Sequence, residues 1–403
     1  MPSTSSINVS QFFEFFKVKI SGQESKETDE TFIVGMESDE RYSHKCSKCG
    51  SEMKLIHSKQ DRYIRDLSFS EKDVYIHLKY SRLYCPECNR YRVEHFDFVQ
   101  PWKRYTERFA LYVHELCKLM TISDVAEHLG LDWKLVKEID KTFLKREYSE
   151  TDYSDLRFLM VDEISIKKGH NYLTVVADYE TGRVVWMGED RKADTLDAFF
   201  EGMMKEQKEC IEAVSVDMWK AYVKSIKANC PKAKIVYDRF HVEREFSKVI
   251  DKIRNREYKK ASEKTRTVIK GSKYLLLSNY ENLGEEGRKA LRELLNINEN
   301  ISTAYILKEM LKKIWEYKYP GWARKALHKW CVLAEKSGIP ELKNFAKKLQ
   351  SHSEGILNHC RFPLSNGRIE GMNTKLKDIK RHVYGFHDLE YYILKCKQAF
   401  PGT

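Results

Sequence analysis

Two short apolar runs that each end in an aspartate constrain the fold of this chain more than any other feature of its sequence. Residues 158–161 precede Asp162, and residues 213–216 precede Asp217. Apolar runs of this length are typical of strands that are buried on both faces of an α/β sheet. Ligands of open α/β sheets gather beyond the carboxyl ends of such strands. The sequence therefore predicts that both aspartates lie at a functional edge of a sheet.

A third carboxylate, Glu370, lies in the segment 366–373, which opens a predicted helix that continues through Lys377 and Arg381. Two strand-end aspartates and a helix-borne glutamate offer the oxygen ligands that Mg²⁺ (or Mn²⁺) prefers. Two such cations can stabilise both the attacking and the leaving oxygen of a phosphodiester. We therefore predict that Asp162, Asp217 and Glu370 are catalytic metal ligands.

The two aspartates also have ordinary structural alternatives. Glu163 competes with Asp162 as the metal ligand, but adjacent strand residues point to opposite faces, and Glu163 shares its face with the apolar Val161. Asp162 is therefore preferred. Asp217 is alternatively the N-cap of a helix that begins near Met218.

The helix that carries Glu370 is predicted to pack its apolar stripe on the sheet and to direct Lys377 and Arg381 toward DNA phosphates. An amphipathic surface helix with ordinary polar neighbours would show the same spacing. Asp238 and His241 follow another predicted strand end, and we predict that they lie beside the metal. A helix-capping aspartate and a hydrogen-bonded histidine are the alternative for this pair.

Two Cys-x-x-Cys pairs predict a structural zinc site; they are Cys46 with Cys49, and Cys85 with Cys88. Four thiolates complete a tetrahedral Zn²⁺ site and leave no open position for catalysis. The interval 50–84 exceeds the usual spacing of a zinc ribbon, so either its strands are long or its loop is large. A redox-active pair is the alternative, and the presence of a second pair argues against it.

Residues 122–136 are predicted to form a helix-turn-helix, with Gly130 in the turn. The apolar residues Val125, Ala126, Leu129, Val136 and Ile139 recur at the spacing of a common core. The second helix is predicted to present Lys134, Lys137 and Lys141 outward, as a recognition helix in the major groove requires. A helical hairpin that does not bind DNA is the alternative.

The rest of the pattern divides the chain into modules. Strands predicted at 157–162, 171–178 and 183–189, followed by strand–helix alternation, are typical of an RNase-H-like layer. The predicted fold is therefore multidomain α/β, with an amino-terminal arm (1–40), a zinc-ribbon domain (41–100), a helix-turn-helix domain (101–150), an RNase-H-like catalytic domain (155–245 and 356–400) and an all-helical insertion (246–355). Within the insertion, Trp315, Trp322 and Trp330 are predicted core aromatics, with stacking on unpaired bases as the alternative.

The charge balance favours a polyanionic partner. The 403 residues include 71 Lys and Arg against 60 Asp and Glu, a formal net charge of +11, which is typical of proteins that bind double-stranded DNA. No secretory signal and no membrane span are visible. Ten cysteines without a secretory signal argue against a disulfide framework, so an intracellular location is expected.

These motifs occur in an order that resembles the DDE transposases of the ISL-three family of bacterial insertion sequences. The resemblance runs from about residue 45 to residue 395 and includes the segments 161–163, 216–218, 238–242, 366–373 and 384–386. It implies that Asp162, Asp217 and Glu370 form the catalytic triad of an RNase-H-like domain. It also implies amino-terminal modules that bind the element's terminal inverted repeats, a dimer or larger assembly on DNA, and a cytoplasmic, nucleoid-associated protein.

Two other classes of function are compatible with the sequence. A regulator derived from a transposase would use the ribbon and the helix-turn-helix without cutting DNA. An RNase-H-like nuclease would cut by DNA structure and would not transfer strands. The presence of all three carboxylates favours a transposase.

Overall fold

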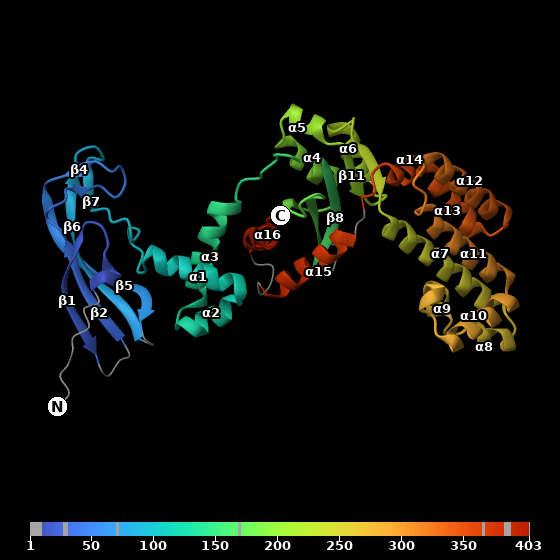
Figure 1. Ribbon diagram of the computed structural model, residues 1–403, viewed down its shortest axis with the longest axis horizontal. Coiled ribbons are helices and arrows are strands. Elements are labelled where there is room, and N and C mark those ends of the chain that lie inside the picture. The colour runs from blue at the N-terminus through green and yellow to red at the C-terminus, as the bar shows by residue number, and fades with distance from the viewer. Residues whose placement is uncertain are drawn as a thin grey trace. The chain divides into compact units, whose positions relative to one another are not determined.

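We describe the protein from a computed structural model of the 403-residue chain. The structure describes residues 10–26, 31–69, 72–167, 171–364, 367–382 and 388–402; at 10–11, 23–26, 166–167, 171, 367–370 and 382 only the backbone is described. The chain forms two compact units, Met1–Glu147 and Tyr148–Thr403 (Figure 1).

The first unit begins with a short 3-10 helix, η1 (Ser10–Phe13), and a five-stranded sheet. The order of the strands is β1-β2-β6-β5, and β7 pairs with β6. Strands β2 and β6 run parallel, and the other neighbours run antiparallel. The strands are β1 (Val18–Lys26), β2 (Thr31–Ser38), β5 (Ile56–Phe69), β6 (Lys72–Cys85) and β7 (Arg90–Val93), and a separate two-stranded sheet joins β3 (His44–Lys45) to β4 (Glu52–Met53).

This sheet corrects the prediction that residues 1–40 form an amino-terminal arm. Residues 18–26 and 31–38 are strands of the same sheet as the ribbon hairpin, and β2 buries Val34 and Met36 against Ile64 and Ile76. The parallel pairing of β2 with β6 joins segments about forty residues apart, so local alternation does not reveal it. Residues 1–9 lie outside the described residues.

The spacing between the cysteine pairs is explained by long strands. Each of β5 and β6 has 14 residues, and they pair antiparallel from Ile56↔Leu83 to Phe69↔Lys72. Of the two possibilities that the interval 50–84 left open, the long hairpin is therefore the correct one.

The predicted helix-turn-helix is present as α2 (Ile122–Leu129) and α3 (Trp133–Tyr148), preceded by α1 (Glu107–Leu119). Thr121 caps α2 in a capping box with Asp124, and Gly130 ends it with a φ of 62°, a left-handed conformation that glycine adopts without strain. The predicted core positions Val125, Ala126, Val136 and Ile139 are buried, and Leu129 is partly buried against them.

The second unit is built on a mixed five-stranded sheet in the order β10-β9-β8-β11-β12. Its first three strands are antiparallel neighbours, whereas β8, β11 and β12 are parallel. The strands are β8 (Phe158–Lys167), β9 (Asn171–Asp178), β10 (Val184–Glu189), β11 (Ala213–Val216) and β12 (Lys234–Tyr237). The three hairpin-like strands predicted at 157–189 are therefore confirmed, but the first does not end at Asp162 as predicted, because β8 continues to Lys167 in its pairing with β9.

Helices cover both faces of this sheet. On one face Leu159 and Val161 pack with α4 (Ala193–Glu201) and α6 (Lys220–Asn229) in one core, and α5 (Lys205–Cys210), which lies between these helices in the sequence, buries none of its residues. On the other face Met160 and Ile164 pack with residues of α15 (Gly367–His382) and α16 (Leu389–Ala399). The alternation of β8 thus directs Asp162, which shares a face with Met160, toward α15.

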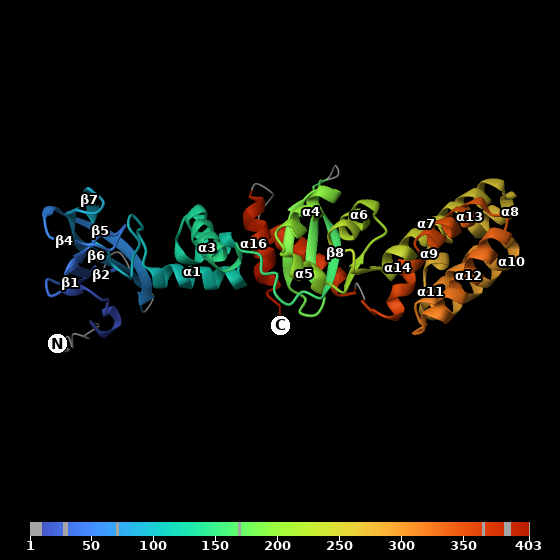
Figure 2. The same cartoon turned by 90° about the horizontal axis from the view of Figure 1, so that it is seen from above.

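A block of helices separates β12 from α15 (Figure 2). It begins at Arg239, directly after β12, and not at residue 246 as predicted, because Asp238 caps α7 by accepting hydrogen bonds from the backbone of Phe240 and His241. The helices are α7 (Arg239–Lys260), α8 (Glu263–Ile269), α9 (Lys273–Leu277), η2 (Tyr280–Asn282), α10 (Glu285–Ile297), α11 (Glu299–Ile314), α12 (Pro320–Lys336), α13 (Pro340–Ser351), α14 (Ser353–Leu357) and η3 (Asn358–Cys360).

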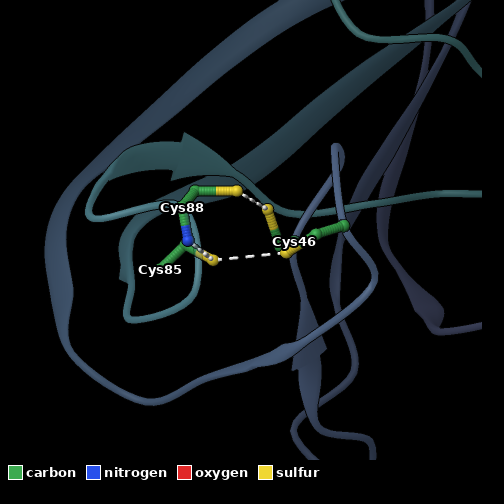
Figure 3. A group of neighbouring side chains, drawn as sticks. Cys46, Cys85 and Cys88 are labelled. Carbon is green, nitrogen blue, oxygen red and sulfur yellow. Dashed lines mark hydrogen bonds between the residues drawn. The ribbon is translucent and has the colours of Figure 1, made fainter.

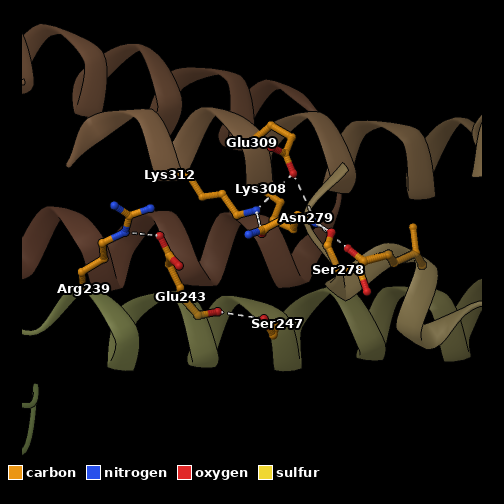
Figure 4. Close-up of polar contacts among 9 residues, drawn as sticks. Arg239, Glu243, Ser247, Ser278, Asn279, Lys308, Glu309 and Lys312 are labelled. Carbon is orange, nitrogen blue, oxygen red and sulfur yellow. Dashed lines mark hydrogen bonds and ion pairs between the residues drawn. The ribbon is translucent and has the colours of Figure 1, made fainter. Parts of the chain in front are cut away.

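A buried lysine ties α11 to the end of α9. Lys308 donates hydrogen bonds of 2.7 Å to the carbonyl oxygens of Leu276 and Ser278, and Lys312 on the next turn contacts Asn279 (Figure 4). Burial lowers the pKa of Lys308. The lysine satisfies carbonyl groups at a helix end, so we assign it to the packing of the helical block. No helix in the described part of the chain has the length and apolar character needed to cross a membrane.

The three tryptophans of this block differ in their surroundings. Trp330 is fully buried, donates from Nε1 to the Leu307 carbonyl at 2.7 Å, and lies edge-on to Phe246 and Phe345. The prediction of a core aromatic is confirmed for Trp330 and wrong for Trp322, which is 61% exposed. Trp315 is partly buried at the edge of the core.

We expect Trp330→Ala to lower the free energy of unfolding of the helical block by about 3–5 kcal/mol, because it removes a large buried side chain and leaves a cavity. Trp322→Ala is the matched control and is expected to change it by less than about 0.5 kcal/mol. Urea unfolding followed by circular dichroism measures both changes. Equal stability of the two variants would contradict the assignment of Trp330 to the core.

Candidate active site

Three aspartates lie level with one another on the parallel strands of the second unit. Asp217 and Asp238 directly follow β11 and β12, whereas Asp162 lies within β8, which continues to Lys167. Ser215 pairs with Met160, so two residues further Asp217 is level with Asp162. Val216 pairs with Tyr237, so one residue further Asp217 is level with Asp238. Because parallel neighbours in register share their faces, the three residues occupy equivalent positions at the carboxyl edge of the sheet.

Asp162 connects this edge to the helix that carries Glu370. Its side chain is 9% exposed and accepts hydrogen bonds from the backbone of Glu163 at 2.8 Å and from Asn373 Nδ2 at 2.6 Å. Asn373 follows Glu370 by three residues on α15, and residues at this spacing lie on the same side of a helix. The helix therefore brings the Glu370 position to Asp162, although the side chain of Glu370 lies outside the described residues.

Asp217 has one defined partner in the turn that leads to α6. Its Oδ1 accepts a hydrogen bond of 2.9 Å from the backbone N–H of Trp219. The helix itself begins at Lys220, with Trp219 as its N-cap residue. The alternative of Asp217 as the N-cap is therefore wrong by two positions, and one oxygen of its carboxylate has no hydrogen bond to the described residues.

Burial raises the pKa of both Asp162 and Asp217, and neighbouring carboxylates add to the shift. Burial raises the pKa of Asp162; the Glu163 backbone, His241 and Asn373 oppose this effect, and Asp238 adds to it. Burial likewise raises the pKa of Asp217, with Asp162 adding to the shift. Buried carboxylates that disfavour each other's charge are the donor set that a hard divalent cation neutralises.

A cation at this edge needs a further donor. In the described part of the chain, the one group of three or more side chains arranged to hold a metal ion is the cysteine cluster of the first unit. Asp162 and Asp217 would supply two ligands to such a cation, and a carboxylate from α15 has the chemistry to complete the set. With such a third carboxylate, the residues at this edge fit Mg²⁺ or Mn²⁺.

We expect Asp217→Asn to raise the thermal midpoint of the metal-free protein at pH 8. A carboxyl group whose pKa is raised by folding holds its proton more tightly in the folded state, so its ionisation destabilises the fold as the pH rises through that pKa. The asparagine has no such penalty, and its advantage should shrink as the pH falls toward 4. Scanning calorimetry in EDTA checks this, with Asp378→Asn as the control; a midpoint that falls at pH 8 would contradict it.

Glu163, the alternative to Asp162 as the metal ligand, forms an ion pair with an arginine. Arg191 Nη1 lies 3.3 Å from Glu163 Oε1. The guanidinium carbon lies 4.3 Å from the centre of the Tyr172 ring and 4.8 Å from that of Trp219. This sandwich holds a positive charge beside the strand ends. Arg191 was not predicted from the sequence, because its partners Glu163, Tyr172 and Trp219 lie on separate elements.

Asp238 and His241 combine the two predicted roles. Asp238 is the N-cap of α7, and His241 Nδ1 lies 2.8 Å from its Oδ2. Burial lowers the pKa of His241, but the neighbouring carboxylates of Asp238 and Asp162 raise it more. The capping alternative is thus correct for Asp238, and the pair also lies beside Asp162.

A cleft of about 1180 Å³ opens between this edge and the helical block. Asp162 and Asp238 lie on the sheet side, and the lining of the block includes aromatic residues, among them Phe240 and Trp315. The basic residues of the lining are Arg239, Arg244, Lys318 and Lys377. The acidic residues of the lining also include Glu163 on the sheet side and Glu243 and Glu316 on the block. A cleft that places cations and aromatic rings beside these carboxylates is suited to a nucleic-acid strand.

The predicted DNA-binding cations differ in their exposure and in their partners. Lys377 is exposed and lines the cleft, whereas Arg381 is exposed, pairs with Asp378 at 3.3 Å and is not among the described lining residues. Lys134 is exposed near the start of α3, and Lys137 and Lys141 on the same helix are half-buried.

The four cysteines of the first unit gather as predicted (Figure 3). Cys46 Sγ lies 3.9 Å from Cys88 Sγ, Cys49 Sγ lies 3.5 Å from Cys85 Sγ, and all four sulfur atoms lie within 4.8 Å of one another. A tetrahedron with Zn–S bonds of about 2.3 Å has edges of about 3.8 Å. Burial raises the pKa of the Cys85 thiol to about 12, so a cation is needed to hold this thiolate at neutral pH.

Three family models match the chain in the order of these elements. Residues 43–88 match the zinc-finger of transposases of the IS204/IS1001/IS1096/IS1165 group, and residues 94–144 match the helix-turn-helix domain of transposase family ISL3. Residues 159–396 match the ISL3 DDE model, described as a transposase.

Curated relatives cover most of the chain. The transposase for insertion sequence element IS1001 of Bordetella parapertussis is 38% identical over 361 residues, which are 89% of this chain and 89% of the relative. The transposase for insertion sequence element IS1557 of Mycobacterium tuberculosis is 27% identical over 391 residues, covering 89% of this chain and 86% of that protein.

Proposed function

The chain belongs to the ISL3 (ISL-three) family of DNA transposases, and on this premise we propose that Asp162, Asp217 and Glu370 hold the divalent cations with which it cuts and rejoins DNA. One observation carries the proposal. The carboxylates of Asp162 and Asp217 are in register, Asp162 lines the cleft, and α15, which bears Glu370, is hydrogen-bonded to Asp162 through Asn373.

The sheet and its covering helices are proposed to be an RNase-H-like domain. Three antiparallel strands continued by two parallel strands, with helices on both faces, support this assignment. The domain is proposed to comprise residues 155–238 and 361–400, with the helical block 239–360 inserted between them. The zinc ribbon and the helix-turn-helix are proposed to occupy 10–100 and 101–147.

The chemistry is proposed to depend on placement of DNA rather than on covalent catalysis. Bound Mg²⁺ or Mn²⁺ supplies charge neutralisation at the attacking and leaving oxygens of the phosphodiester. Asn373 orients the carboxylate of Asp162, and the Trp219 backbone orients that of Asp217. Lys377 and Arg244 on the cleft bind phosphates on either side of the reacting group.

The amino-terminal unit is proposed to choose the DNA sequence. The exposed Lys134 lies near the start of α3, the second helix of the helix-turn-helix, where recognition helices contact base edges. Structural Zn²⁺ is proposed to stabilise the ribbon, which precedes the helix-turn-helix in the chain. Recognition of two terminal inverted repeats in one reaction implies a homodimer or a larger assembly on DNA.

Cleavage of DNA that carries the flanks of this protein's own gene tests the proposal. Metal-dependent cuts at defined positions in the flanks, present with Mg²⁺ and absent with EDTA, are the expected result. Sequence-specific binding without a cut would move the chain to the class of non-catalytic regulators. Cuts that follow DNA structure rather than the flank sequence would indicate a nuclease without strand transfer.

A further inference from the structure

A second pocket, of about 430 Å³, lies on the other side of η3 from the cleft. It is lined by β12, α12, α13, α14 and the residues after them, and it shares no lining residue with the cleft. Three cations face it, each from a different element. They are Lys234 on β12, Arg324 on α12 and Arg361 after η3, and Glu354 is the acidic residue of the lining.

Among the described residues these three cations form no ion pair, whereas some basic residues of the helical block do. Arg256 contacts Glu341, and Lys348 lies 2.5 Å from Glu245. In the described part of the chain, by contrast, Lys234, Arg324 and Arg361 have no carboxylate within 4.0 Å. Three unpaired cations against one carboxylate leave the pocket with two positive charges in excess, which favours an anionic ligand.

The pocket lies close to the cleft along the chain. Asn358 lines the pocket, and the next residues of η3, His359 and Cys360, line the cleft. Asn358 Nδ2 donates to the Ile235 carbonyl at 2.8 Å and so fastens η3 to β12. On β12 itself, Lys234 lines the pocket and Tyr237 lines the cleft. The three residues of strand from Lys234 to Tyr237 span about 10 Å. This span equals roughly three base-pair steps of about 3.4 Å each.

We propose that this pocket binds phosphates of the DNA backbone a few base pairs away from the reacting phosphodiester. The inference rests on the proposed function, because it takes the DNA in the cleft as its starting point. A DNA backbone and a free phosphate ion would both be recognised through their phosphate oxygens. The form of the pocket favours the DNA backbone over the free anion. Lys234, Arg324 and Arg361 are exposed side chains on an open wall and do not enclose one small ligand.

The salt dependence of DNA binding tests this pocket. Lys234, Arg324 and Arg361 are replaced together by Gln in the full chain, and affinity for an element end with its flank is measured by fluorescence anisotropy in EDTA. Each lost phosphate contact should reduce the slope of log K against log salt by about 0.9. Salt at 200 mM weakens binding relative to 50 mM. If three contacts are lost, the factor by which it weakens binding should be roughly 40-fold smaller in the variant than in the wild type.

A matched variant controls for net charge. Lys264, Lys289 and Arg292 on α8 and α10 are exposed, line neither site, and lose the same three charges when replaced by Gln. The slope of log K against log salt should decrease at least twice as much in the pocket variant as in this control. Equal slopes in the two variants, with folding of both verified by circular dichroism, would overturn the proposal.

Two further results distinguish a phosphate-backbone site from a free-anion site and from failure of the proposed function. Inorganic phosphate at 10 mM that raises the thermal midpoint of the wild type but not of the pocket variant, with unchanged DNA slopes, would identify a free-anion site and overturn the backbone proposal. Wild-type protein that binds ends but makes no Mg²⁺-dependent cut counts against the proposed function. Cutting by the wild type with an unchanged slope in the pocket variant counts against this pocket alone.

Discussion

Asp162→Asn, Asp217→Asn and Glu370→Gln are each expected to abolish strand cleavage while leaving the affinity for element ends within about threefold of the wild type. Each change removes an anionic metal ligand and preserves side-chain size. Metal-ion catalysis contributes several kcal/mol to transition-state stabilisation, which at 1.36 kcal/mol per tenfold corresponds to roughly 10³-fold or more in rate. End-labelled DNA in Mg²⁺ reports cleavage, and anisotropy in EDTA reports binding.

Two control variants make this prediction specific. Asp378→Asn removes an exposed carboxylate from the same helix as Glu370, where it pairs only with Arg381 among the described ion pairs, and should cut at the wild-type rate. Glu163→Gln should retain more activity than Asp162→Asn, because Glu163 pairs with Arg191. A dead Glu163→Gln enzyme beside an active Asp162→Asn enzyme would reverse the assignment of the first ligand. Loss of DNA binding in all three triad variants would show that they are not purely catalytic.

Asn373→Ala should show an intermediate defect. Its side chain donates to Asp162 and is not itself a metal ligand in the proposal. Loss of such a supporting hydrogen bond typically costs 10- to 100-fold in metal affinity or activity. The accompanying readout is the Mg²⁺ concentration for half-maximal cleavage, which should rise in this variant and stay unchanged in Asp378→Asn.

Removal of zinc is expected to unfold the cysteine-bearing end of the ribbon and to abolish specific end binding, while residues 148–403 keep their fold. Structural Zn²⁺ in zinc-finger peptides contributes apparent binding energies of about 10–16 kcal/mol, which is far more than the small core around the cysteines supplies. That core consists of Cys46, Met53, Leu83 and Cys85, with Cys88 packed against it. Cys46→Ser or treatment with a zinc chelator produces the change.

Metal analysis and hydrogen exchange measure the two parts of this result. The wild type should contain one zinc per chain, and Cys46→Ser should lose it together with exchange protection in β3, β4 and the ends of β6 and β7. Cys210→Ser changes an exposed thiol of α5 and is the matched control. Full zinc content in Cys46→Ser, or a reversible disulfide in place of zinc, would favour the redox alternative.

Several elements of the fold could be predicted from local patterns because these patterns reflect burial directly. In the run 158–161, Leu159, Met160 and Val161 are buried as predicted for a strand with helices on both faces, and Phe158 is half-buried. The positions Val125, Val136 and Ile139 meet in the core of the helix-turn-helix. Two pairs of cysteines predicted a metal cluster whose sulfur atoms do gather. In each case the residues that define the feature lie within one strand, one helical turn or one knuckle.

Other features depend on pairings across long distances in the sequence. The strand β2 joins the ribbon sheet through parallel contacts with β6, and neither strand carries a mark that selects the other. Arg191 acquires its role only because Tyr172 and Trp219 stack on it from separate segments. Loop closure over such distances is driven by the summed burial of whole faces, which no short window of sequence contains.

The sequence by itself determined the types of chemical group at the site and the faces on which they lie, because the strand period of two and the helix period of 3.6 assign each side chain to a side. The tertiary structure decided which of these groups meet. It aligned Asp162, Asp217 and Asp238 through strand register, and it joined Asn373 to Asp162 across 211 residues. Register and helix docking arise from the packing of complete surfaces, so only the folded chain could bring these groups to one edge.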